Sequence, residues 1–522
     1  MSVAEATCTI AERESVSRRG AVGAGILSLL AALKLIIQFA GIRHYGFFRD
    51  ELYYLACGQH LAWGYIDQPP LIALVAWLER HILGDSIVSI RLLPVLAGAA
   101  IVVLTALLAR DLGGGRFAQF LAGATILLAP AYLAFDSFLS MNAFEPLFWL
   151  LCAWIVVRIV NGEPDRLWLV FGLVAGLGLE NKHTVLVFGL GIAVGLLLSG
   201  EARLYRSKWI WIGALIALIV FLPNLVWEAR HGWPQIAVVR NAQQLKNVPV
   251  SPGRFLVEQA LFLDPIALPV WVGGLVWLLA APQAKRFQFL GWAYLVVLGA
   301  VMLLHGKTYY VLPAYPMLIA AGGVFLETIR DKGGLWLRRT VPAALAVGGL
   351  LGLPLAVPVL PVNALLRYSN LLNFARVQTE RDATVPLSQL HADMFGWENL
   401  ATQVATVFHS LPAAEQPGCA ILAGNYGEAG AIDYYGPRLG IPRAISGHNS
   451  YYDWGPRSYT GACVIILGER ADEFVRYFGK VERVATVSNP YGMPIEQAVP
   501  IYVCHEPSAP LSELWPRFKM II

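Results

Sequence analysis

Apolar stretches long enough to cross a lipid bilayer recur from near the N-terminus to about residue 360. A membrane-spanning helix needs about 20 consecutive, mostly apolar residues. The chain is only 14% charged, whereas soluble domains have about 25% charged residues. A wholly soluble protein and a disordered one are both excluded, because so few polar residues cannot cover so much apolar surface. We expect eleven spans, over 21–42, 86–109, 117–134, 137–159, 167–182, 184–199, 208–227, 257–281, 287–304, 310–328 and 340–360.

The Lys and Arg residues between these stretches predict the orientation of the chain. Such residues are enriched in the cytoplasmic loops of membrane proteins. They are frequent in the short connections on the side of the N-terminus and sparser in the longer connections on the other side. We therefore expect a cytoplasmic N-terminus and, with an odd number of spans, a C-terminus outside. The net charge of +4, without a basic stripe, gives no indication of a nucleic-acid partner.

The apolar pattern divides the chain into three expected parts. After about residue 361 charged residues return and turn signals become frequent. Two stretches there, 419–436 and 464–487, alternate between strand and helix patterns, which predicts a small extracytoplasmic α/β domain. The parts are a cytoplasmic tail (1–20), a transmembrane catalytic domain (21–360) with extracytoplasmic loops (41–85 and 228–256), and the α/β domain (361–522).

Two features of the C-terminal part are open to more than one interpretation. Cys419, Cys463 and Cys504 fall together there, which allows one disulfide without indicating its pair. The glycines of GNYGEAG (424–430) do not have the GxGxxG spacing of a nucleotide-binding loop. We interpret them as turn glycines of an α/β fold.

The first external loop, HYGFFRDELYYLACGQHLAWGYIDQPPL (44–71), holds the densest set of ionisable side chains. Asp50 and Glu51 follow Arg49 at the mouth of the first span. The apolar residues of ELYYLACGQHLAW have helical spacing, so we expect an amphipathic helix on the membrane surface, ended by the Pro-Pro turn. The loop alone does not separate a site from an interfacial anchor, since aromatic belts and acidic helix starts are common.

Four further clusters of polar side chains lie at the expected external ends of spans. Ionisable groups in or beside a span are costly and are therefore functional candidates. Helix-start carboxylates and a snorkelling Lys–Glu pair are the alternative interpretations. Anchors alone would be spread over both faces, so the convergence of all five clusters on one face favours a site. The four clusters are Asp136, Asn142 and Glu145; Glu180, Lys182 and His183; Glu228, Arg230 and His231; and Lys307, Tyr309 and Tyr310.

Three of these stretches resemble glycosyltransferase family 39, the protein O-mannosyltransferase and aminoarabinose-transferase-like group with the C-type membrane fold. They are FFRDELYYLACGQHLAWGYIDQPPL, LVWEARHGWP and GKTYYVLPAYP, and the resemblance covers about residues 20–330. It implies transfer of a sugar, with inversion, from a polyprenyl-phosphate donor to an acceptor outside, which is a protein, a lipid or a glycan. It also implies that Asp50 is the catalytic carboxylate and that a second acidic residue lies near the start of the fourth span, where Glu145 is available. The expected location is a bacterial inner (cell) membrane.

The residues suit this chemistry without the resemblance. An acceptor hydroxyl that attacks the sugar needs a base, and a lipid-phosphate leaving group needs positive charge or N–H donors. Asp50 is our first choice of base, with Glu51 and Glu145 as further catalytic candidates; adjacent helical residues point to different sides, so Asp50 or Glu51 should be structural. No metal-ligand set is assigned, and a divalent cation stays open as a cofactor. The expected donor- and substrate-binding residues are Arg49, Asp67, Asp136, Lys182, His183, Arg230, Lys307, Tyr309 and Tyr310.

A transporter or flippase of a lipid-linked sugar is the alternative function. Transporters keep their polar residues near the middle of the membrane, with broken helices and repeated halves. No repeat is visible here, so an enzyme is favoured. A polymerase or ligase of cell-surface glycans shares the donor class and stays open, whereas HExxH and GxSxG, which would indicate a protease, do not occur. The sugar, the acceptor and the oligomeric state do not follow from the sequence.

Overall fold

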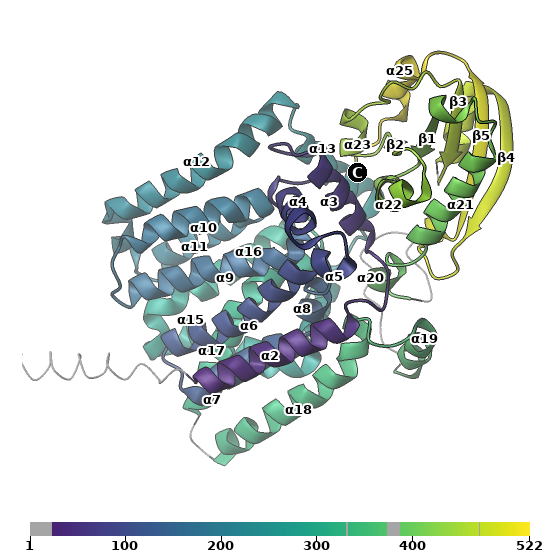
Figure 1. The fold of residues 1–522 in the computed structure, drawn as a ribbon. Coiled ribbons are helices and arrows are strands. Elements are labelled where there is room, and N and C mark those ends of the chain that lie inside the picture. The colour runs from purple at the N-terminus through teal and green to yellow at the C-terminus, as the bar shows by residue number, and fades with distance from the viewer. Residues whose placement is uncertain (1–22, 330–331, 373–386, 469) are drawn as a thin grey trace, which may run out of the picture.

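A bundle of apolar helices carries a small sheet domain at one end (Figure 1). The computed structural model describes residues 23–329, 332–372, 387–468 and 470–522. The expected cytoplasmic tail, 1–20, lies outside these residues. The bundle consists of α2 (Ala24–Gly41), α5 (Ile87–Ile90), α6 (Leu92–Asp111), α7 (Arg116–Leu128), α8 (Pro130–Phe135), α9 (Met141–Val160), α10 (Leu167–Asn181), α11 (Val185–Leu198), α12 (Lys208–Arg230), α14 (Pro252–Leu263), α15 (Leu268–Ala280), α16 (Gln288–Leu303), η5 (Thr308–Ala314), α17 (Tyr315–Thr328) and α18 (Lys332–Ala356).

The helices agree with a multi-pass integral membrane protein. Within the described residues, seven are long and apolar enough to cross a membrane, or eight if α14 and α15 form one broken span. Three shorter apolar helices, α7, α10 and α11, occupy the other expected regions. Many of their apolar side chains face outward, as on α12, where Leu215 and Ile219 are more than half exposed. Such surfaces are stable in contact with lipid and costly in water.

The span expected over 257–281 is not a single straight helix. The chain bends by 97° between α14 and α15. Asp264 stands at the break with a φ of 75°, a conformation that a non-glycine residue rarely adopts, and its side chain accepts a hydrogen bond from the Ile266 amide. Pro265 follows and cannot continue the α14 hydrogen-bond ladder. Pro130 interrupts the expected span 117–134 in the same way, between α7 and α8.

The C-terminal domain contains a mixed five-stranded sheet, so the predicted fold class is confirmed. The strand order is β2-β1-β3-β5-β4, with β1, β2 and β3 parallel and β4 and β5 antiparallel to their neighbours. Cys419 and Cys463 face each other on β1 and β3 and form a disulfide, which leaves Cys504 as a buried free thiol. The domain consists of α21 (Trp397–Ser410), β1 (Cys419–Ala423), α22 (Tyr426–Leu439), β2 (Ile445–Ser446), α23 (Ser450–Asp453), β3 (Cys463–Leu467), α24 (Ala471–Phe474), β4 (Phe478–Ser488), β5 (Ala498–Pro507) and α25 (Leu511–Leu514).

Short helices lie between the bundle and the sheet domain (Figure 1). They are α3 (Arg49–Gln59), α4 (Leu71–Leu83), α13 (Pro234–Asn241), α19 (Val362–Leu371) and α20 (Gln389–Ala392). The expectation that α3 lies on the membrane surface as an amphipathic helix is wrong. Every residue from Leu52 to Gly58 is buried, because apolar side chains occur on all faces of the helix and it packs between α4 and α22. Its side chains belong to the same hydrophobic core as β1 and β3.

Candidate active site

Asp50 lies in the first turn of α3 and borders a cavity. Its side chain is 31% exposed, in contrast to most of the helix. The hydroxyl of Tyr426, on α22, donates a hydrogen bond of 2.9 Å to Asp50 Oδ1. Arg49 Nε lies 3.7 Å from the same oxygen. A small molecule in the cavity can therefore reach this carboxylate.

Glu51 is fully buried and has a structural role. Its carboxylate forms an ion pair with Arg91, with distances of 2.7 and 3.0 Å to the guanidinium nitrogens. It also accepts hydrogen bonds from the backbone amides of Leu139, at 2.9 Å, and Phe48, at 2.7 Å. The second of these satisfies the N-cap amide at the start of α3. Because both oxygens are engaged, Glu51 is poorly placed to take a proton from a substrate.

The cavity beside Asp50 has a volume of about 340 Å³ and an amphipathic lining, and we call it the Asp50 cavity. A phosphate can pair with its cations, while a hydrocarbon chain can contact its apolar side chains. The polar part of the lining consists of Arg49, Asp50, Asn142, Lys246, Lys307, Tyr309, Ser369, Ser388, Gln389 and His391. The apolar part includes Phe48, Pro130, Phe135, Phe138, Leu261, Phe262, Leu355, Leu365, Leu387 and Leu390.

Lys182 and Glu145 form a second charged group next to this lining. Glu145 is buried on α9, and its carboxylate lies 2.7 Å from Lys182 Nζ. Lys182 also donates a 2.8 Å hydrogen bond to Asn142, which borders the Asp50 cavity, and lies 4.5 Å from the centre of the Tyr310 ring. The pair considered from the sequence was Lys182 with Glu180, but the structure pairs Lys182 with Glu145 instead. Glu145 therefore holds Lys182 and contacts the cavity only through it.

Asp67 is placed at the joint between the bundle and the sheet domain, outside the lining of the Asp50 cavity. Its carboxylate accepts hydrogen bonds from the Tyr53 hydroxyl, at 2.7 Å, and from the Asn449 side chain, at 3.0 Å. Burial raises the pKa of Asp67 to about 6, although both hydrogen bonds favour its charged form. Its partners indicate a structural joint, not a contact with the donor.

Three other predicted residues also lie outside the lining of the Asp50 cavity. Asp136 is buried and its carboxylate lies 2.7 Å from Lys34 Nζ, from α2. His183 shares a 2.9 Å hydrogen bond with Asn224 of α12. Arg230 is exposed at the end of α12. The structure thus brings together Arg49, Asp50, Lys307 and Tyr309, with Lys182, Glu145 and Tyr310 behind them, and leaves Asp67, Asp136, His183 and Arg230 apart.

Sequence reasoning missed two residues at this site. Lys246 borders the Asp50 cavity, and its charge in a long external loop is the signal that could have identified it. Tyr426 hydrogen-bonds Asp50 across 376 residues of sequence. No local pattern predicts a contact over that distance.

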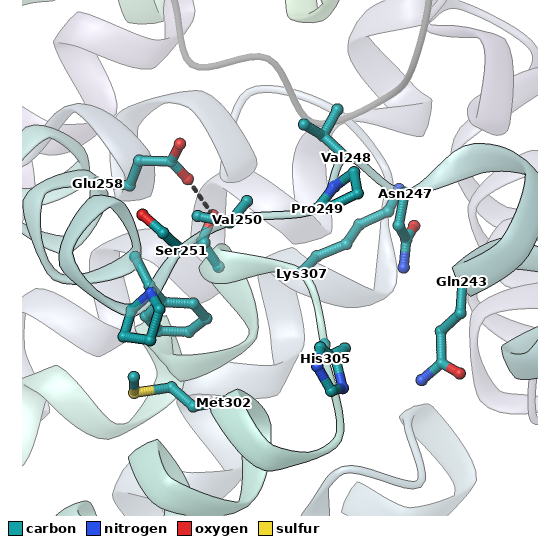
Figure 2. A pocket seen from close by; sticks show the side chains of 14 residues that line it. Gln243, Asn247, Val248, Pro249, Val250, Ser251, Glu258, Met302, His305 and Lys307 are labelled. Carbon is teal, nitrogen blue, oxygen red and sulfur yellow. Dashed lines mark hydrogen bonds between the residues drawn. The ribbon is translucent and has the colours of Figure 1, made fainter.

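A second cavity, of about 510 Å³, lies next to the first and is lined by both polar and apolar residues (Figure 2). Lys307 borders both cavities, and Figure 2 shows its side chain extending toward Asn247. Glu258 accepts a 2.8 Å hydrogen bond from the Thr308 hydroxyl in its wall. His305 stands at the opposite wall with a φ of 52°. Amide, hydroxyl and imidazole groups of this kind suit a ligand that carries many hydroxyls.

In the described part of the chain, one group of side chains has the spacing of metal ligands: Glu415, Cys463 and His505. Cys463 is bonded to Cys419, so its sulfur is not a free thiolate. These residues belong to the sheet domain and border neither cavity.

Comparisons with known proteins indicate the class of enzyme. Residues 67–227 match the family model for dolichyl-phosphate-mannose-protein mannosyltransferase. The chain is also similar to the lipid A galacturonosyltransferase RgtD of Rhizobium johnstonii, with 26% identity over 418 residues, which cover 77% of this chain and 84% of that protein. The chain is a membrane glycosyltransferase that resembles this family. The resemblance inferred from the sequence is thereby confirmed, and an enzyme is favoured over a transporter.

Solved structures of other glycosyltransferases share the fold of this protein. ArnT from Cupriavidus metallidurans is 14% identical, with TM-scores of 0.58 for the structure bound to undecaprenyl phosphate and 0.60 for the apo state. Each comparison covers 92% of this chain and 98% of ArnT. The arabinofuranosyltransferase AftD from Mycobacteria gives a TM-score of 0.51 at 14% identity, covering 94% of this chain and 40% of AftD.

Proposed function

We propose that this glycosyltransferase transfers a sugar from a polyprenyl-phosphate donor to a hydroxyl acceptor, with Asp50 as the catalytic base. The observation that carries the proposal is the amphipathic lining of the Asp50 cavity, in which one accessible carboxylate lies among cations and apolar side chains. We place the cavity at the external face of the membrane, together with the sheet domain. This placement follows the distribution of Lys and Arg along the chain.

The donor fits this cavity in two parts. Arg49, Lys246 and Lys307 supply positive charge for the phosphate. A phosphate needs no proton to leave as an anion, so cations are sufficient to stabilise the developing charge. The apolar part of the lining suits the first isoprene units, and the rest of the chain can stay in the bilayer. That ArnT was crystallised with undecaprenyl phosphate supports this class of donor.

Asp50 is the carboxylate in the cavity lining that can take a proton from the acceptor. Glu51 is held by Arg91, and Glu145 is held by Lys182. A single base acting on the acceptor hydroxyl while the lipid phosphate leaves from the other side of the sugar ring gives inversion at C1. Glu145 orients Lys182 and, through it, Asn142 in the wall of the cavity.

The acceptor occupies the second cavity in this proposal, where amide, hydroxyl and imidazole groups are available. That cavity adjoins the first at Lys307, so a hydroxyl of the acceptor can approach the sugar beside the phosphate. The similarity to a lipid A galacturonosyltransferase makes lipid A the first acceptor to test and galacturonic acid the first sugar.

The direct experiment uses purified protein in lipid nanodiscs with undecaprenyl-phosphate-linked galacturonic acid and lipid A. We expect lipid A to gain the mass of one sugar while undecaprenyl phosphate is released. If the donor instead crossed a liposome membrane and no acceptor gained mass, the proposed transfer would be wrong.

Lys307→Met should lower kcat/KM for the lipid donor roughly tenfold to hundredfold. The substitution keeps the length of the side chain but removes the charge that faces the phosphate, whose charge-assisted contacts are among the stronger ones in proteins. Initial rates at several donor concentrations measure the effect. Lys480→Met, on the exposed strand β4, is the matched control and should behave like the wild type. Equal values for both variants would remove Lys307 from the donor site.

Asn247→Ala should raise KM for the acceptor several-fold, by about the value of one or two hydrogen bonds, and leave KM for the donor within about twofold. Asn247 borders the second cavity and not the first, which is why the two constants should separate. Asn399→Ala, on the exposed side of α21, is the control amide. A rise confined to the donor constant would assign the second cavity to the donor.

A further inference from the structure

The sheet domain contacts the start of α3 at Asp50, the proposed catalytic base. Tyr426 is the first residue of α22, and its hydroxyl donates to Asp50 Oδ1 at 2.9 Å. One helical turn further along α3, the Tyr53 hydroxyl contacts Ser450 Oγ at 2.8 Å. Asp50 and Tyr53 are three residues apart and therefore share a face of the helix, the face that the sheet domain covers.

Two glycines of α22 allow this close approach. A Cβ atom on Gly430 would lie 2.9 Å from the backbone carbonyl carbon of Leu52, and one on Gly427 would lie 2.5 Å from Arg49 Cγ. Both distances are too short for a carbon contact, so only glycine fits without displacing α22. The glycines of GNYGEAG were interpreted as turn glycines. Gly427 and Gly430 instead lie within α22 and pack it against α3.

The Tyr426 ring is held on several sides. Asn425 caps α22 and accepts hydrogen bonds from the amides of the next turn, which fixes the backbone at Tyr426. The ring lies 4.7 Å from the ring of Tyr53 and 4.7 Å from that of His448, with the Arg49 guanidinium 5.7 Å from its centre. A side chain packed in this way keeps its hydroxyl in one place, as a positioning group must.

We propose that Tyr426 is a positioning residue for Asp50, so that the sheet domain supplies part of the active site. The inference rests on the proposed role of Asp50. The Tyr426 hydroxyl occupies Oδ1 and fixes the rotation of the carboxylate. Among the described residues Oδ2 has no hydrogen-bond partner, and this oxygen accepts the proton of the acceptor hydroxyl. The proton moves from the acceptor oxygen to Oδ2 as that oxygen bonds to C1 of the sugar, and the C1–O bond to the phosphate breaks with its electron pair on the phosphate.

The test is Tyr426→Phe, which removes one oxygen atom and keeps the packed ring. We expect kcat to fall about tenfold or more, since a misdirected base loses its near-attack geometry. The donor KM should stay within about twofold, because Tyr426 does not border the Asp50 cavity. Tyr434→Phe is the matched control: it lies on the same helix, and its hydroxyl also bonds to the membrane part of the chain, at the Asp85 carbonyl. A purely structural role would affect both variants alike, and a wild-type kcat for Tyr426→Phe would overturn the inference.

Two further measurements separate this inference from the proposed function. Wild-type turnover by Asp50→Asn contradicts the role of Asp50 itself. If Asp50→Asn is impaired, adding Tyr426→Phe should slow its residual transfer no further, because the hydroxyl acts through the carboxylate. A second tenfold loss in the double variant would show that Tyr426 acts independently of Asp50 and would overturn the inference alone. Gly430→Ala should reproduce the loss of kcat by moving α22 away from α3, and turnover at the wild-type rate would contradict it.

Discussion

Asp50→Asn is expected to lower kcat for sugar transfer by about a hundredfold or more, the usual contribution of a general acid–base group. The amide has the size of the carboxylate but cannot take a proton from the acceptor hydroxyl. The fold should be unaffected, because the Asp50 side chain is 31% exposed and the amide oxygen can still accept the Tyr426 hydrogen bond. Single-turnover transfer with saturating donor measures the chemical step. Size-exclusion profiles and thermal unfolding in detergent establish that the variant is folded.

Glu145→Gln is the informative companion to Asp50→Asn. Glu145 reaches the Asp50 cavity only through Lys182 and Asn142, so its variant should retain more activity than Asp50→Asn. Near wild-type transfer by Asp50→Asn together with an inactive Glu145→Gln would move the catalytic assignment to the start of α9.

Arg91→Met is expected to destabilise the protein by about 3–5 kcal/mol, the cost of breaking a buried ion pair from one side. Glu51 would be left in a fully buried site without the guanidinium that lies 2.7 Å away. The carbonyl oxygens of Ile42 and Gly46 would also lose their donor, at 3.1 and 2.8 Å. The start of α3 should loosen, because Glu51 also caps that helix. The loss should be visible as a lower unfolding temperature of the purified protein.

Arg80→Met is the matched control for Arg91→Met. Arg80 pairs with Asp85 at the surface, where the two side chains are 20% and 44% exposed. Surface pairs contribute about 0–1 kcal/mol, so this variant should unfold almost like the wild type. Equal losses in the two variants would mean that the buried pair contributes no more than the exposed one.

The sequence predicts the helical bundle well because length and hydropathy decide whether a helix can cross a bilayer. It does not predict the break at Asp264, where one residue with positive φ and the following proline outweigh an apolar stretch of the right length. The disulfide was open among three cysteines until strand pairing placed Cys419 opposite Cys463. The break depends on local backbone geometry and the disulfide on strand register. Composition and hydropathy reveal neither the geometry nor the register.

The sequence also predicts part of the candidate site, namely the residues whose position relative to a span follows from hydropathy. Charged and aromatic residues at span ends indicated Asp50, Lys182 and Lys307 without any contact information. The sequence could say that Asp50 and Glu51 point to different sides of a helix, but the buried partner Arg91 comes 40 residues after Glu51. The contribution of Tyr426 depends on the docking of a separate domain. The sequence therefore indicates which side chains are chemically suited to a site, but not the roles that depend on a partner far away in the chain, such as Arg91 or Tyr426.

The shared core of α3 and the sheet domain also determines when the site is complete during biosynthesis. Tyr426 follows Asp50 by 376 residues, and a ribosome that adds about 5–20 residues per second needs roughly 20–75 s to synthesise that length. During this time α3 can pack against α4 but lacks its cover by α22, although its residues from Leu52 to Gly58 are buried in the complete fold. The active site therefore closes late in folding, after the bundle has been inserted. A chain that stops short of α22 lacks the hydroxyl on Asp50, so a truncated translation product cannot form the complete site.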